Sequence, residues 1–177
     1  MKKKTSYITF CAVISALSVA LMMASYFPYL TYAIPALSGA LIIMPLVEIG
    51  KKYSLFTYLV SAVLVFIFAE AEAKLMYITF FGYYPLLKSV LEKIKSRVIE
   101  YALKFLCFNG AITVVYLGLA SLFGIEKDSF GQFGEWGVAV LYIMGNIAFI
   151  LYDMCLTKLC GYYMYRLHTK IKKIMRF

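Results

Sequence analysis

Residues 7–27 read YITFCAVISALSVALMMASYF, a stretch without a single charged side chain. A helix needs about 20 mainly apolar residues to cross the ~30 Å hydrocarbon core of a bilayer, so this stretch predicts a transmembrane helix. It is too long for the apolar part of a signal peptide, and no small-x-small cleavage site closes it. We therefore expect the chain to begin with a membrane span that is retained.

Similar apolar stretches follow along the rest of the chain. The sequence is 63% hydrophobic and 15% charged, whereas soluble domains are about 45–50% apolar and 25% charged. The stretches do not alternate in polarity as the strands of a membrane barrel do. We predict an all-α membrane protein, a bundle of six transmembrane helices in a single domain over residues 1–177, whose residues 158–177 form a basic cytoplasmic tail. The predicted spans are residues 7–27, 29–49, 54–69, 74–91, 102–123 and 137–157.

The charged residues predict how these spans are oriented. The formal net charge is +9, and most basic residues lie before the first span and after the second, fourth and sixth spans. The other connections are mainly acidic, with Glu70, Glu72, Glu126, Asp128 and Glu135. Because basic connections stay in the cytoplasm, both termini are predicted to be cytoplasmic. This topology accounts for the basic residues without a nucleic-acid partner.

The sequence lacks the usual signatures of an enzyme. It has no phosphate-binding glycine loop, no HExxH, no GxSxG and no paired carboxylates within a span. The four cysteines show no CxxC spacing and are interpreted as reduced apolar residues. His168, the only histidine, is interpreted as a surface residue of the basic tail. We expect no catalytic residue, no metal and no cofactor.

Small residues line one face of the first span. Ala12, Ala16, Ala20 and Ala24 recur every four residues, so they stack along one side of a helix. Small residues at this spacing allow another helix to approach closely in lipid. The partner is either a helix of the same bundle or a separate membrane protein, and spacing alone leaves both open.

Polar side chains form stripes on the last three spans. Unpaired polar groups are costly in a bilayer, so these stripes should face inward. The set nearer the outer side resembles the lining of a pocket for a small, partly aromatic solute; the alternative is interfacial aromatics joined by interhelical hydrogen bonds. Lys74 either meets an anionic group of the solute or anchors its helix at the headgroups. The predicted solute-binding residues are Lys74, Tyr77, Thr113, Tyr116, Trp136, Tyr142 and Asn146.

Two further features lie in the fourth and sixth spans. Toward the cytoplasm, Asp153 is predicted to pair with either Lys88 or Lys158. Pro85 lacks a backbone N–H and clashes with the carbonyl of Phe81, which predicts a kink in the fourth span.

On these features the chain resembles the substrate-binding S-components of energy-coupling factor (ECF) vitamin transporters. That family consists of six-helix proteins with both ends cytoplasmic, whose first helix docks through an alanine-x-x-x-alanine face on a membrane coupling subunit. The resemblance implies that Ala12, Ala16, Ala20 and Ala24 form this face. It also implies uptake of a vitamin-like solute bound near the outer surface among helices four to six, powered by a separate cytoplasmic ATPase pair. The alternative is a small non-transporting scaffold of the cell-shape or division machinery, similar to MreD.

Overall fold

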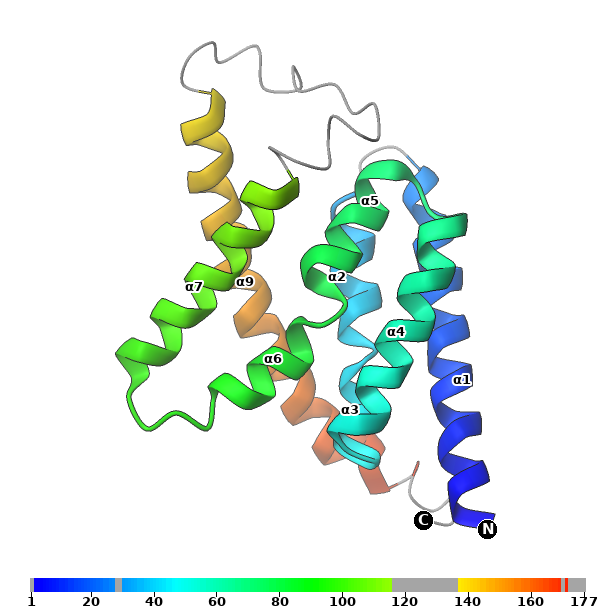
Figure 1. Cartoon of the computed structure of the whole chain (residues 1–177). Coiled ribbons are helices and arrows are strands. Elements are labelled where there is room, and N and C mark those ends of the chain that lie inside the picture. Colours follow the sequence, from blue (N-terminus) through cyan, green and yellow to red (C-terminus); the bar gives the residue numbers. More distant parts are fainter. Residues whose placement is uncertain (1, 28–29, 116–136, 170, 172–177) are drawn as a thin grey trace. The chain divides into compact units, whose positions relative to one another are not determined.

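The computed structural model describes residues 2–27, 30–115, 137–169 and 171, and within these ranges the chain forms helices, turns and no strand (Figure 1). The predicted all-α class is confirmed. The chain divides into two compact units: unit 1 comprises residues 1–87 and 155–177, and unit 2 comprises residues 88–154. Each unit is described separately below.

Three helical segments are long and apolar enough to cross a membrane. They are Lys4–Tyr26, Lys51–Phe68 and Tyr142–Leu167, and a shorter apolar segment covers Ala33–Glu48. Large apolar side chains on the second of these segments are exposed, which suits lipid rather than water. They include Leu55, Phe56, Leu59, Val63, Phe66 and Ile67.

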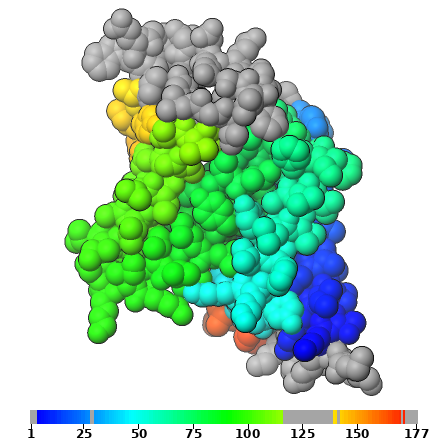
Figure 2. Space-filling view, viewed as in Figure 1, coloured from blue at the N-terminus to red at the C-terminus, as the bar shows by residue number. Residues whose placement is uncertain are grey.

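Unit 1 is built around two long helices that lie side by side. Helix α1 (Lys2–Met23), continued by the short 3₁₀ turn η1 (Ala24–Tyr26), packs against helix α4 (Lys51–Phe68) (Figure 1). In the space-filling view their side chains meet directly, blue beside cyan (Figure 2). Ser15 of α1 donates a hydrogen bond to the Thr57 carbonyl at 3.2 Å, and both residues are buried. Small hydroxyl side chains let the two backbones approach closely, as is common between membrane helices.

The second predicted span is helical but broken in the middle. Helix α2 (Ala33–Ala40) ends before Leu41, and helix α3 (Ile43–Glu48) begins after Ile42. Pro45 explains the break, because in a continuous helix its ring would clash with the carbonyl of Leu41, four residues earlier. The turn to α4 follows at Gly50, whose φ of 118° favours glycine.

The fourth predicted span is interrupted where the sequence placed its kink. Helix α5 (Ala71–Met76) leads into a π-helical turn, η2 (Tyr77–Phe81), and helix α6 (Tyr84–Leu91) begins beside Pro85. The Gly82 N–H donates to the Tyr77 carbonyl at 2.8 Å, which widens the helix by one residue. The predicted kink is therefore confirmed, and it consists of a π-turn followed by a new helix start.

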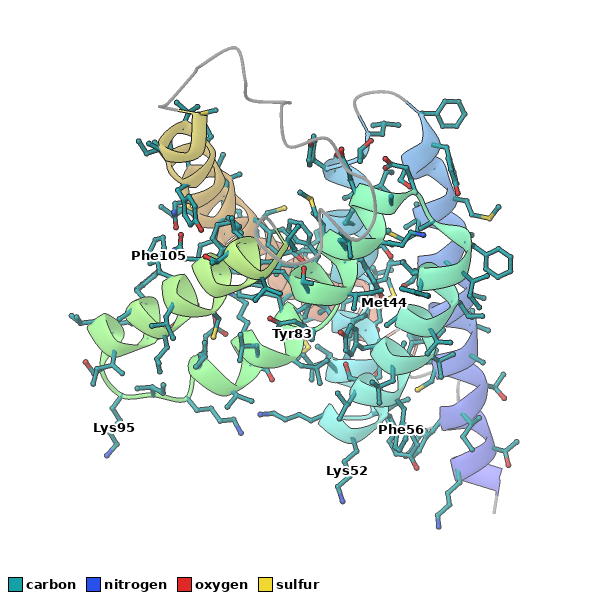
Figure 3. The ribbon with its side chains drawn as sticks, turned by 45° about the horizontal axis from the view of Figure 1, so that its top comes forward. Met44, Lys52, Phe56, Tyr83, Lys95 and Phe105 are labelled. Carbon is teal, nitrogen blue, oxygen red and sulfur yellow. The ribbon has the colours of Figure 1, made fainter. Side chains whose placement is uncertain are left out.

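Unit 2 contains the end of α6, helix α7 (Arg97–Val114) and the first part of helix α9 (Gly137–Tyr162). Helix α7 begins five residues before the predicted fifth span, after a short turn that carries Lys95 on its surface (Figure 3). Helix α9 passes from unit 2 into unit 1 and continues through the π-turn η5 (Tyr163–Leu167). The last helix thus extends well into the predicted tail.

Candidate functional site

Helix α1 has two faces of small residues, and they differ in burial. One face holds the buried residues Cys11, Ile14, Ser15, Ser18 and Met22. The opposite face holds the predicted alanine stripe, in which Ala12, Ala16 and Ala20 are exposed and Ala24 is partly exposed. Within the described residues, the serine face makes the internal packing and the alanine face is turned outward.

The serine face surrounds one of the predicted solute-binding residues, Tyr77. The Tyr77 ring is fully buried in unit 1, and its hydroxyl lies 2.7 Å from the Ser61 hydroxyl. The hydroxyls of Ser18 and Ser38 adjoin it, and these two serines each donate to the other's carbonyl, at 3.4 and 3.0 Å. Tyr77 therefore joins helices α1, α2 and α4 to η2 through a buried cluster of hydroxyls, and in this conformation it offers no surface to a solute.

Lys74 lies near Tyr77 along the chain but has a different environment. Its ammonium group donates to the Phe66 carbonyl at 3.3 Å and lies 5.6 Å from the centre of the Phe66 ring. This contact joins α5 to the end of α4. Such a geometry suits an anchoring lysine at the edge of a span.

Three predicted solute-binding residues come together in unit 2, where α7 and α9 are joined by polar pairs. The hydroxyls of Thr113 and Tyr142 lie 2.6 Å apart. One turn further, Asn109 and Asn146 exchange two hydrogen bonds of 3.0 Å, each amide donating to the other's oxygen. The second N–H of each amide donates to a carbonyl of its own helix, so both amides use all their donors. A solute that bonds Asn146 through its N–H groups must open this pair.

Aromatic packing continues the α7–α9 contact below the amide pair. Phe108 stacks on Phe149 with ring centres 4.6 Å apart, and Phe105 meets the same ring edge-on at 5.4 Å (Phe105 in Figure 3). The helices approach closely at Gly145, where an added Cβ would lie 3.0 Å from Ile112. The α7–α9 pair is thus polar at one end and apolar in the middle.

A network of buried charged side chains surrounds Asp153 in unit 2. Asp153 accepts from Lys88 at 2.5 Å and from Lys104 at 3.3 Å, and Lys104 also pairs with Glu100 at 2.8 Å. These four side chains are at most 9% exposed, while Glu92, which pairs with Lys88 at 2.8 Å, is 43% exposed. The predicted Asp153–Lys88 pair is confirmed, and the alternative with Lys158 is not the one formed.

Lys104 and Glu100 are members of this network that the sequence analysis missed. Their spacing of four residues on one helix was a usable signal, because such pairs meet on a helix surface. The network contains two buried cations and two buried anions, so its charges are balanced in a medium where an unpaired charge is costly.

A second buried carboxylate, Glu48, lies in unit 1. It accepts from the Tyr163 hydroxyl at 2.8 Å, and its Oε1 lies 3.0 Å from His168 Nδ1. The Glu48 side chain is 1% exposed and that of His168 is 31% exposed. His168 is thus partly exposed, and the sequence analysis missed its contact with Glu48, which forms because the chain after η5 reaches the end of α3.

The predicted solute-binding residues are described in two separate parts. Lys74 and Tyr77 belong to unit 1, and Thr113, Tyr142 and Asn146 belong to unit 2. Tyr116 and Trp136 lie outside the described residues. In comparisons with known proteins, this chain matches no family model, no curated protein and no solved structure.

Proposed function

We propose that this protein is the solute-binding membrane subunit of an ECF-type transporter, an S-component, in the bacterial cell membrane. In this function the chain binds a small vitamin-like organic solute, and a membrane coupling subunit with a cytoplasmic ATPase pair supplies the energy. The observation that carries the proposal is the outward direction of the alanine face of α1. Six spans with both termini in the cytoplasm belong to the same proposal.

The shape of the two outward helix faces supports a protein partner at α1. The exposed side chains of α4 are large, among them Phe56 and Val63, and suit fluid lipid chains. The exposed side of α1 also carries large side chains, among them Val13 and Leu17, but Ala12, Ala16 and Ala20 form a strip of small side chains along it. Such a shallow strip allows the backbone of another helix to come close, and close packing is what drives helix association in lipid.

Tryptophan substitutions on α1 test the docking. Ala16→Trp and Ala20→Trp should abolish co-purification with the coupling subunit, because the indole fills the strip. Val63→Trp is the matched control, since it places the same ring on the exposed face of α4. The variants and the wild type are purified from native membranes, and their partners are identified by mass spectrometry. Normal assembly of both alanine variants with a coupling subunit and ATPases would show that this face is not the docking surface.

The solute site is proposed at the polar end of the α7–α9 pair. Thr113, Tyr142 and Asn146 bring hydroxyl and amide groups together beside apolar walls, which is the usual composition of a small-molecule site. Lys74, Tyr116 and Trp136, which the sequence also predicts to bind the solute, stay predictions. A solute contact at Asn146 requires the Asn109–Asn146 pair to exchange one partner for the solute.

Paired substitutions separate solute binding from helix packing. Asn146→Leu and Asn109→Leu both break the amide pair, but only Asn146 is proposed to contact the solute. Native mass spectrometry of the gently purified protein identifies the bound molecule, and titration then gives its affinity. Asn146→Leu should weaken binding about tenfold to a hundredfold, and Asn109→Leu should weaken it less. Equal losses in both variants would assign the effect to helix packing, and a wild-type protein without any bound molecule would contradict the proposed function.

A further inference from the structure

One end of unit 1 gathers polar side chains from three separate segments. The end of η1 contributes Ser25, the segment before α2 contributes Thr31 and Tyr32, and the start of α5 contributes Glu70 and Glu72. The Thr31 hydroxyl donates to the Ser25 carbonyl at 3.4 Å, and the Tyr32 hydroxyl donates to Glu72 Oε2 at 3.1 Å. These bonds hold the three segments together at the end of α1 and α4 where the sequence predicts the outer side of the membrane.

Two buried polar atoms at this end have no hydrogen-bond partner among the described residues. They are the hydroxyl of Ser25, a residue that is 1% exposed, and Oε2 of Glu70. A buried polar group without a partner costs about 1–3 kcal/mol, and such groups are uncommon in native proteins. Thr31 lies near both residues, because its hydroxyl donates to the Ser25 main-chain carbonyl and is within hydrogen-bonding reach of the Glu70 carboxyl. Both unpaired oxygens can accept a hydrogen bond from a ligand.

The charge at this end is negative. Burial, and then the nearby Glu72 carboxylate, raise the pKa of Glu70 by more than the Ala73 N–H and the Thr31 hydroxyl lower it. Glu70 therefore holds a proton more readily than an ordinary glutamate. A positively charged group beside Glu70 would likewise offset the cost of keeping its carboxylate charged near Glu72.

We propose that Ser25 and Glu70 form a binding site for a protonated amine, with the Glu70 carboxylate as ion-pair partner and the Ser25 hydroxyl as a second acceptor. An ammonium group offers a few N–H donors to a few acceptors, which matches these oxygens. A metal ion such as Ca²⁺ takes six to eight oxygen ligands, more than these two unpaired atoms provide. The exposed ring of Tyr32 is held by Glu72, two residues along the chain from Glu70, and suits an aromatic amine. This site belongs to unit 1 and goes beyond the proposed function, whose solute is proposed to bind in unit 2.

Matched small probes test the site in protein reconstituted in lipid nanodiscs. Benzylammonium chloride, benzyl alcohol and sodium benzoate share one ring and differ in charge, and the alcohol controls for partitioning into lipid. Benzylammonium should raise the melting temperature of the wild type in a dose-dependent manner at pH 7, while the alcohol and benzoate should not. Glu70→Gln keeps the size of the side chain and should abolish this shift, and Ser25→Ala should weaken binding about tenfold. Glu92→Gln, which removes a carboxylate of unit 2, should leave the shift unchanged.

Several results would overturn the site. Equal shifts with all three probes, or an undiminished benzylammonium shift in Glu70→Gln, would remove the role of the carboxylate. Equal shifts with potassium or calcium chloride would make it an inorganic cation site. Native mass spectrometry separates this inference from the proposed function. A co-purified solute and coupling partner without a benzylammonium shift refute the amine site only, whereas amine binding at Glu70 without any co-purified solute or coupling partner refutes the transporter only.

Discussion

Asp153 accepts from two lysines within unit 2, Lys88 on α6 and Lys104 on α7. Asp153→Asn leaves these buried ammonium groups with one carboxylate fewer. Because an uncompensated buried charge is strongly unfavourable, we expect this variant to lose about 3–5 kcal/mol of stability. Thermal unfolding in detergent measures the loss, with the exposed Lys158→Asn as a control that should change little.

A double variant that removes one cation together with Asp153 separates charge balance from the loss of the side chain itself. Replacing Asp153 by Leu and Lys88 by Met removes one cation and one anion together and leaves Lys104 with Glu100. Buried ion pairs can often be exchanged for apolar residues at little cost, so the double variant should be more stable than Asp153→Asn. A double variant that is less stable would show that the network stabilises unit 2 by more than charge balance. Asp153→Asn should change solute affinity little.

Two glycines show how helix contacts depend on the space around one residue. An added Cβ at Gly39 of α2 would lie 2.7 Å from the carbonyl carbon of Phe81, whereas at Gly110 of α7 it would meet nothing within 4 Å. Gly39→Ala must therefore push α2 away from η2. We expect a loss of about 1–3 kcal/mol in Gly39→Ala and a gain of up to ~1 kcal/mol in Gly110→Ala from better helix propensity. Equal changes in the melting temperature of both variants would contradict the close α2–η2 contact.

The elements that the sequence predicted best are those governed by local chemistry. Pro85 marks the interruption before α6 because the clash of a proline ring acts four residues away on the same helix. The same rule applied to Pro45 accounts for the break between α2 and α3, which the sequence analysis overlooked within a uniformly apolar stretch. Helix α9 extends beyond its predicted span of residues 137–157, since the apolar stretch ends before the helix does.

For the whole molecule, the topology is tested by labelling. In a variant whose native cysteines are replaced by alanine, single cysteines are placed at Ser129, Ser96 and Lys170. A membrane-impermeant maleimide added to intact cells should label position 129 and fail at positions 96 and 170, because basic connections stay in the cytoplasm. Lysed cells are the control in which all three positions should react. Labelling of position 96 or 170 in intact cells would overturn the six-span topology with both termini inside.

The sequence predicted the candidate site only for the residues that lie on the same pair of helices, α7 and α9. The stripes of Thr113 and Asn146 were visible as three- and four-residue steps, and the structure joins these residues to Tyr142 and Asn109 on the facing helix. Tyr77 belonged to a stripe with the same spacing but is buried among serines. The spacing of polar residues predicts which face of a helix they lie on, but it does not predict which residues of other helices face them.

The sequence by itself determined that the chain is helical, that it has helices apolar enough to cross a membrane, and that Pro85 marks an interruption of the fourth predicted span. These properties follow from composition and from contacts within one turn. Only the tertiary structure decided that Ser15 and Ser18 of α1 face inward and its alanines outward, since both sets are small residues at helical spacings. It also decided that Asp153 meets Lys88 and Lys104, and that Glu48 meets His168. Such partners lie far apart along the chain, and their pairing depends on how the helices pack in space.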